Sequence, residues 1–141
     1  MPMQHDLERN KAVVQRFNRE VIEAGDEAAA AALLDPEFVN RTAPPGADPG
    51  PQGMVSFLCR VLHSALGEIR VEIQDQIAEG DRVVTRKTLQ GLHRGELFGV
   101  QATGKRVTIE IIDIVRVRNG RYLEHWGSNN LTSVLASLSK T

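Results

Sequence analysis

Apolar residues in the first half of the chain recur with the spacing of amphipathic helices. Residues 7–24 carry Leu7, Val14, Phe17 and Val21 on one helical face. The pattern predicts a second, alanine-rich helix over residues 26–34, because an aspartate at its start is a favourable N-cap and a proline at position 36 disfavours helix in the residue before it. A third amphipathic helix is expected over residues 52–66.

The second half of the chain alternates apolar and polar residues, as strands do. Residues 69–74 and 83–88 flank a Glu-Gly-Asp turn, and residues 107–117 and 122–126 flank Asn119-Gly120, a strong hairpin signal. The pattern therefore predicts three helices followed by a four-stranded antiparallel meander. Residues 38–40 form at most a brief strand. Residues 43–53, with four prolines and three glycines, are expected to form a loop and to act as a lid.

This order of elements is typical of an α+β domain in which helices cover one face of the sheet. The strand over residues 107–117 carries apolar residues on both faces, with Ile109 and Ile111 on one side and Ile112 and Ile114 on the other. One chain has enough helices for only one face. A homodimer formed by packing sheet against sheet is the expected cover for the second face.

Composition narrows the class of protein. A chain of 141 residues with 41% hydrophobic and 25% charged residues has the size and balance of one globular domain, which we assign to residues 1–141. A net charge of −1 disfavours nucleic acid as a partner. A single cysteine, no long apolar run and no leader pattern predict a cytoplasmic protein that neither crosses nor binds a membrane.

Three motifs resemble those of a known family. Residues 79–99, EGDRVVTRKTLQGLHRGELFG, are similar to the "eGDrVv.R.t..GtH.Ge..G" stretch of the SnoaL-like polyketide cyclases. Residues 102–107, ATGKRV, are similar to "PTGk.v", and residues 120–127, GRYLEHWG, to "dGkivEhWg". The resemblance covers nearly the whole chain. It implies the cone-shaped fold of the nuclear-transport-factor-two-like superfamily, in which a curved antiparallel sheet wraps around about three N-terminal helices, encloses a pocket and often forms homodimers.

The resemblance also implies where the chemistry would lie. Family cyclases use an aspartate four residues beyond the tryptophan as general acid and base, and here that position is Asn130. Their histidine from the strand before the last hairpin is also missing, since residues 113–116 read Asp-Ile-Val-Arg. An amide does not exchange a proton near neutral pH, so these departures leave the pocket in place but question aldol chemistry.

Asp113 and His125 are, with Asn130, the candidate catalytic residues. Asp113 lies between two isoleucines, where an ionised carboxylate needs a partner, and Arg86 on the neighbouring strand is the expected one. Such a pair is similar to the site of epoxide hydrolases of this superfamily, or is a structural ion pair. His125 and Trp126 face opposite sides of their strand, so only one of them lines the pocket. An outward His125 would lie half-exposed or at the dimer interface.

The remaining candidates would bind a substrate. The pocket is expected to have aromatic walls and two further polar residues, namely Phe17, Phe57, Phe98, Trp126, Arg86 and His93. His93 alternatively fixes a bend between strands, and His63 is expected in solvent. The histidines lack ligand spacing and no glycine-rich loop precedes a lysine, so neither a metal nor another cofactor is expected.

The leading hypothesis is a SnoaL-like protein with an apolar pocket for a small cyclic or polyketide-like molecule. Its chemistry would be cofactor-free cyclisation, isomerisation or hydration by acid and base groups. Three alternatives remain open: a protein of the same fold that binds a ligand without transforming it, an enzyme similar to epoxide hydrolases, and a domain whose exposed sheet binds another protein.

Overall fold

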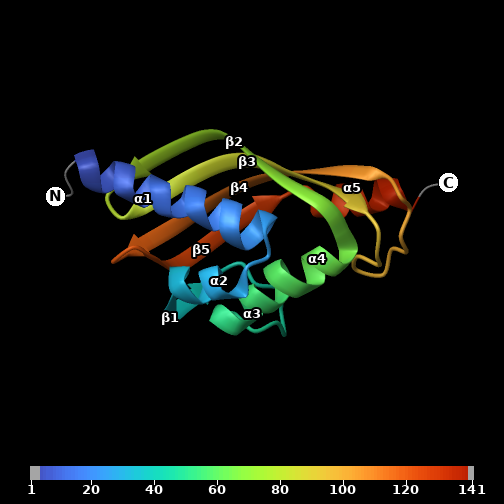
Figure 1. Cartoon of the computed structure of the whole chain (residues 1–141), viewed down its shortest axis with the longest axis horizontal. Helices are drawn as coiled ribbons and strands as arrows, with labels where there is room; N and C mark the ends of the chain where they lie inside the picture. The colour runs from blue at the N-terminus through green and yellow to red at the C-terminus, as the bar shows by residue number, and fades with distance from the viewer. Residues whose placement is uncertain (1–3, 140–141) are drawn as a thin grey trace.

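A curved five-stranded sheet forms the centre of the molecule (Figure 1). The computed structural model describes residues 4–139. Residues 1–3 belong to the N-terminal segment in which no leader pattern was expected, and they lie outside the described residues. The strand order is β1-β5-β4-β3-β2, and only β1 runs parallel to its neighbour. The strands are β1 (Leu34–Asn40), β2 (Leu66–Glu79), β3 (Arg82–His93), β4 (Arg106–Arg118) and β5 (Arg121–Asn129).

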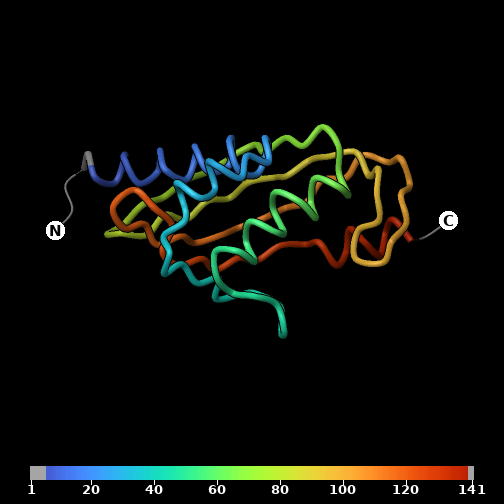
Figure 2. The backbone as a smooth tube through the Cα atoms, turned by 60° about the horizontal axis from the view of Figure 1, so that its bottom comes forward, coloured from blue at the N-terminus to red at the C-terminus, as the bar shows by residue number. Residues whose placement is uncertain are grey.

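The helices lie mainly on one face of this sheet (Figures 1 and 2). The first helix is α1 (Gln4–Phe17), continued by the π-helical segment η1 (Asn18–Glu23), and α2 (Glu27–Leu33) follows it. The next helix is continuous through α3 (Pro51–Val55), the π-helical segment η2 (Ser56–Val61) and α4 (Leu62–Ala65). The chain ends in α5 (Leu131–Leu138).

The structure confirms the helix cap and the hairpin turn that the sequence predicted. The Asp26 carboxylate accepts hydrogen bonds from the backbone N–H groups of Ala28 and Ala29, at 2.9 and 3.1 Å, and so begins α2. Asn119 and Gly120 both adopt positive φ angles, 53° and 76°, as a tight β4–β5 hairpin turn requires. The predicted four-stranded antiparallel meander is formed by β2, β3, β4 and β5.

Two elements differ from the prediction. The brief strand expected at residues 38–40 is the seven-residue β1, which adds a fifth, parallel strand beside β5. Its partner is more than eighty residues away, and no local pattern reports such a pairing. Residues 131–138 form α5, although the sequence pattern indicated only sheet after residue 66. This segment is short and packs mainly against β4, so its helix depends on tertiary contacts.

The two faces of the sheet have different environments. We call the face under α1 the inner face; it carries Val83 and Leu89 of β3 and Val115 of β4, all buried with Phe17 and Val14 of α1. The opposite, outer face is uncovered in the single chain, and Ile112 there is 51% exposed. None of the helices in the described residues is long and apolar enough to cross a membrane.

Candidate functional site

Charged side chains are buried on the inner face of the sheet. Residues of β3 alternate between faces, so Lys87 points inward with Val83, Thr85 and Leu89. Asp113 of β4 lies opposite Thr85 and also points inward. The side chains of Lys87 and Asp113 are only 4% and 6% exposed. An isolated buried charge is costly, so the two ions must compensate each other.

These residues, together with His125, form what we call the inner-face cluster. The Lys87 Nζ lies 3.1 Å from Asp113 Oδ2. His125 of β5 lies opposite Val115, and its Nε2 is 3.6 Å from the same Oδ2, just beyond direct hydrogen-bond distance. The other carboxylate oxygen, Asp113 Oδ1, is buried and has no hydrogen-bond partner among the described residues. The carboxylate therefore retains one free acceptor.

The surroundings keep Asp113 ionised. Burial alone would raise the pKa of Asp113, but the Lys87 ammonium and then His125 outweigh it, so the pKa lies below its usual value. Burial, followed by the nearby Asp113 charge, raises the pKa of Tyr122 well above its usual value, so the phenol stays neutral. The Tyr122 ring stacks on Phe17 with centroids 4.0 Å apart. An ionised carboxylate thus lies in largely apolar surroundings.

The second nitrogen of His125 fixes the orientation of its ring. Nδ1 lies 3.0 Å from Asn40 Oδ1, an oxygen that also accepts from the Thr42 backbone N–H at 3.3 Å. Since Asn40 presents an acceptor, Nδ1 carries a hydrogen, and Nε2 faces Asp113. A proton on Nε2 would point toward the carboxylate. The imidazole and the carboxylate therefore face each other across 3.6 Å.

The structure brings two of the three candidate catalytic residues together but changes the partner of Asp113. Arg86 lies on the outer face and forms an ion pair with Asp75 at 2.6 Å, so its expected pairing with Asp113 is wrong. The physical reason is strand alternation, which sends Arg86 outward and the next residue, Lys87, inward. Continuing the buried period-two series from Val83 would have identified Lys87.

Asn130 and Trp126 lie away from the inner-face cluster. Trp126 pairs with Ile114 on the outer face, and the Arg82 guanidinium lies 5.8 Å from its ring centroid. The Asn130 Oδ1 accepts from the Glu110 backbone N–H at 2.8 Å, and its Nδ2 donates to the Glu110 carboxylate at 3.1 Å. Both polar atoms of the Asn130 side chain are thus hydrogen-bonded to Glu110, at the end of the β4–β5 ladder. Trp126 does not form a wall of the inner face.

The other aromatic candidates are divided between the core and the surface. Phe17 lies in the core beside Tyr122. Phe57 of η2 stacks against Phe98, with centroids 6.0 Å apart, but Phe98 belongs to the β3–β4 connection and is 56% exposed. Phe57 is partly buried against the core and Phe98 is exposed, so the two rings pair at the edge of the core.

The two remaining central histidines have structural contacts. His93 is fully buried, and its Nδ1 accepts from the Thr103 backbone N–H at 3.3 Å, which ties the end of β3 to the following loop. His63 was expected in solvent but is partly buried, with its Nε2 2.8 Å from the Ile22 carbonyl oxygen. In the described part of the chain, no group of three or more His, Cys, Asp or Glu residues has a geometry that would hold a metal ion.

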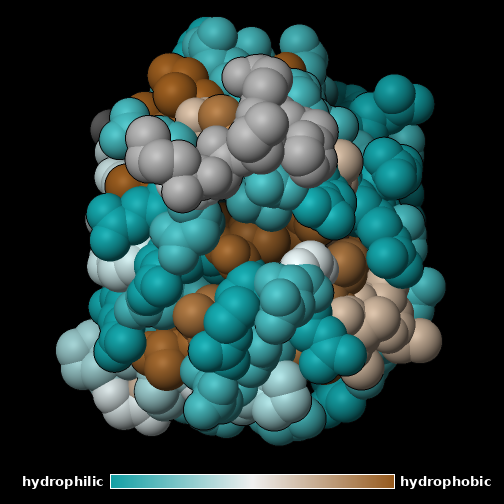
Figure 3. Space-filling view, turned by 90° about the vertical axis from the view of Figure 1, so that its left-hand side faces the viewer, coloured by the Kyte–Doolittle hydropathy of each residue, from teal (hydrophilic) through white to brown (hydrophobic). Residues whose placement is uncertain are grey.

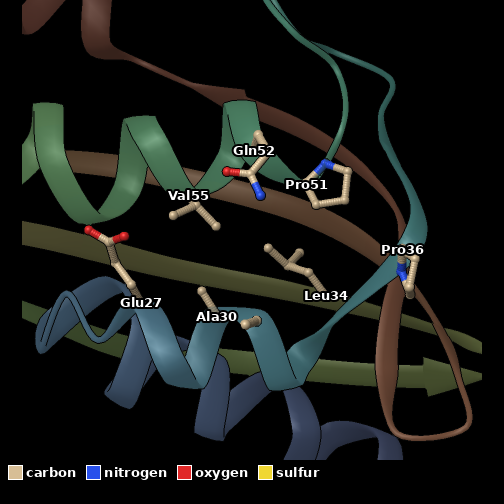
Figure 4. A pocket seen from close by; sticks show the side chains of 8 residues that line it. Glu27, Ala30, Leu34, Pro36, Pro51, Gln52 and Val55 are labelled. Carbon is tan, nitrogen blue, oxygen red and sulfur yellow. The ribbon is translucent and has the colours of Figure 1, made fainter.

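Two pockets are present in the described part of the chain, and one of them reaches the cluster only at Lys87. One, of about 560 Å³, is walled by α2, β1 and α3 and lined by Glu27, Ala30, Ala31, Leu34, Pro36, Pro51, Gln52 and Val55 (Figure 4). The other, of about 460 Å³, is lined by outer-face residues such as Arg86, Thr88 and Ile112, and also by Lys87 of the cluster. Neither is lined by Asp113 or His125. The α2 pocket was missed, although the small side chains at residues 28–32 were a signal that space remains beside that helix.

Comparisons with known proteins agree with this architecture. TsrD from Streptomyces laurentii is 24% identical, with a TM-score of 0.84 over 99% of this chain and 98% of its own. IdmH from Streptomyces antibioticus is 25% identical, with a TM-score of 0.77 over 93% and 99%. An LEH-like epoxide hydrolase from M. tuberculosis shares the fold at 18% identity, with a TM-score of 0.70 over 94% and 91%. No curated protein matches the chain.

The match of a family model is more specific than these likenesses in fold. The model for SnoaL-like polyketide cyclases matches residues 12–138, which include the last part of α1, the later helices and all five strands. The motifs at residues 79–99 and 120–127 lie in β3 and β5 and the connections beside them. The chain belongs to the SnoaL-like polyketide cyclase family.

Proposed function

We propose that this protein carries out cofactor-free acid–base chemistry on a small apolar molecule, with Asp113 and His125 as the proton carriers. The observation that supports the proposal is the buried Asp113 carboxylate, which is held ionised, has one oxygen without a partner and lies beside an imidazole. Buried carboxylates with free acceptors are unfavourable in a purely structural core. They are useful where a proton must be removed from a substrate.

Each proton carrier has a distinct task. Asp113 Oδ1 removes a proton from the substrate, and His125, protonated on Nε2, supplies one at a second position. The Lys87 ammonium, whose Nζ lies 3.1 Å from Asp113 Oδ2, keeps the carboxylate charged. The substrate would reach the inner face between the helices and the sheet. At the end where α1 begins, apolar side chains lie at the bottom of a hollow ringed by hydrophilic ones, which supports such a route (Figure 3).

Two other chemistries are compatible with parts of the site. Hydration of an epoxide is the second candidate, because a buried aspartate paired with a cation, in a fold shared with an LEH-like epoxide hydrolase, can activate water. The cation is Lys87, however, and not the arginine expected from the sequence. Binding without catalysis is the third candidate, because an asparagine occupies position 130, where the resemblance implies an aspartate.

Proton abstraction can be measured without knowing the complete reaction. The protein is incubated in D₂O with methyl acetoacetate, a cyclic 1,3-diketone and styrene oxide, and NMR follows deuterium incorporation and diol formation. We expect exchange at the carbon next to a carbonyl above the buffer rate. Diol formation without exchange would favour the epoxide chemistry. Neither reaction, with binding of the same compounds, would overturn the catalytic proposal in favour of a binding protein.

We further propose that a second copy of the chain covers the outer face. Ile112, half-exposed between strands, and the neighbouring apolar Ile114 form the centre of that uncovered surface. Replacing Ile112 with lysine is expected to convert a dimer into monomers in analytical ultracentrifugation, because a buried ammonium would face the same group of the other copy. Val61→Lys is the matched control, since Val61 is 41% exposed on η2. A wild-type monomer would overturn this proposal and favour a different protein partner.

A further inference from the structure

The α2 pocket, of about 560 Å³, has an apolar interior. Ala30 of α2, Leu34 of β1 and Val55 of α3 are buried, and their side chains point into it (Figure 4). Pockets of this volume hold small organic molecules in many proteins, and a few polar groups give them their specificity. The class of ligand therefore follows from the polar groups that reach this space.

Glu27 lies at one end of the pocket, but its charge is already compensated (Figure 4). Arg60 donates to both carboxylate oxygens, from Nε at 3.0 Å and from Nη2 at 2.8 Å. These hydrogen bonds lower the pKa of Glu27, so the carboxylate and the guanidinium remain a neutral pair. No other charged residue in the described part of the chain lines the pocket. A charged ligand would lack a counter-ion here, which favours a neutral molecule.

Gln52 supplies a polar group that the protein itself does not use. Its backbone oxygen accepts from the Ser56 N–H, whereas its side-chain amide forms no hydrogen bond with another described residue. Figure 4 shows this amide pointing from α3 toward the space between α3 and α2. Pro36 and Pro51, which also line the pocket, have no backbone N–H to offer. The Gln52 carboxamide is therefore the group that would orient a ligand.

The geometry of a carboxamide selects one kind of amide as its partner. A carboxamide has its C=O acceptor and an N–H donor side by side. A lactam is a cyclic amide whose ring holds the amide bond cis, so its N–H and C=O also lie side by side. An open-chain secondary amide is trans, and its N–H and C=O point in opposite directions. A lactam can thus form two parallel hydrogen bonds with Gln52, whereas an open-chain amide can form one.

We propose that the α2 pocket binds a neutral apolar lactam, whose ring packs on Leu34 and Val55 while its N–H and C=O pair with the Gln52 carboxamide. The alanines of α2 that line the pocket leave room for the ring. This site is additional to the proposed function, because neither Asp113 nor His125 lines the pocket.

Two lactams that differ by one N–H test the role of the α2 pocket. 2-Quinolinone is a neutral bicyclic lactam, and 1-methyl-2-quinolinone has the same rings and C=O but no N–H. NMR of methyl-labelled protein measures both affinities and reports where each compound lies. With 2-quinolinone, we expect shifts to concentrate at Leu34 and Val55. The methylated compound should bind about three- to tenfold more weakly, as expected for the loss of one neutral hydrogen bond.

Gln52→Leu removes the proposed partner of the lactam edge. This variant should bind the two compounds with equal affinity. Gln74→Leu is the matched control, because it makes the same change at a glutamine that lines the other pocket, and it should keep the wild-type ratio of affinities. A ratio that persists in Q52L, or equal affinities in the wild-type protein, would overturn the proposal.

Filling the pocket provides a second, independent variant. Ala31→Leu places a larger side chain on the wall formed by α2 and should prevent binding of both compounds. Ala32→Leu adds the same side chain at an exposed position of the same helix that does not line the pocket, so both affinities should remain. Circular dichroism shows whether each variant is folded. Equal binding by A31L and A32L, shifts at Ile112 of the outer face in place of the pocket residues, or no shifts would contradict the proposal.

Discussion

Replacing Lys87 with methionine is expected to lower the free energy of unfolding by about 3–5 kcal/mol at pH 7. Methionine has a similar length, but it leaves the Asp113 carboxylate buried without its cation. The cost arises from this uncompensated charge. Urea denaturation followed by circular dichroism measures the change directly, because the slope of the transition also reports whether the folded state remains compact.

The double variant K87M/D113L identifies the cause of that loss. With both charges absent, stability should return to near the wild-type value or exceed it, since apolar replacement of a buried ion pair is often neutral or stabilising. A double variant as unstable as K87M would show that lost packing, not charge, is responsible.

The acid dependence of K87M has a defined sign. In the wild-type protein the pKa of Asp113 is lowered on folding, so this group contributes stability above its unfolded pKa of about 3.9, and the contribution is lost as the pH falls through the lower folded value. Without Lys87, burial instead favours the protonated acid. The stability difference between wild type and K87M should therefore shrink on acidification. An increasing difference would contradict the assignment.

Asp113→Asn is expected to reduce deuterium exchange at an enolisable carbon by about 100- to 10,000-fold, the range for loss of a general base. The amide has nearly the shape of the carboxylate but cannot take a proton. His125→Ala should slow product formation while leaving part of the exchange, because His125 supplies a proton after abstraction. Rates are measured by NMR at equal concentrations of folded protein.

Asp75→Asn is the matched control for this experiment. It makes the same chemical change in an aspartate that pairs with Arg86 on the outer face, so exchange should remain at the wild-type rate. Exchange that survives in D113N, or falls equally in D75N, would remove Asp113 as the base. A loss in both variants with reduced stability would indicate that removing either carboxylate charge acts by destabilising the fold.

The sequence predicted the parts of the site that depend on local periodicity. The isoleucines beside Asp113 and the motif around His125 selected both residues, but alternation left open which face His125 occupies. The structure places the two residues on the same face of adjacent strands. Along β3, Lys87 and not Arg86 continues the inward series. The error of one residue changes the face of the sheet, and therefore the partner of the carboxylate.

Features that depend on distant segments were not predicted. Asn18 and Asn40 reach the cluster from the first helix and from β1, and their contacts arise only when the sheet and helices pack. The parallel pairing of β1 with β5 has the same origin. The engagement of Asn130 by Glu110 also depends on strand register, which is set by the whole β4–β5 ladder.

The central claim is that a small apolar molecule binds at the inner face, beside Asp113 and His125. Methyl-labelled protein titrated with methyl acetoacetate tests this most directly, because isoleucine and valine methyl groups mark each surface. Shifts should concentrate at Val83, Val115 and Val117, which share the inner face with the cluster and line neither pocket. Shifts confined to Val55 in the α2 pocket or to Ile112 on the outer face, or no shifts, would contradict the account.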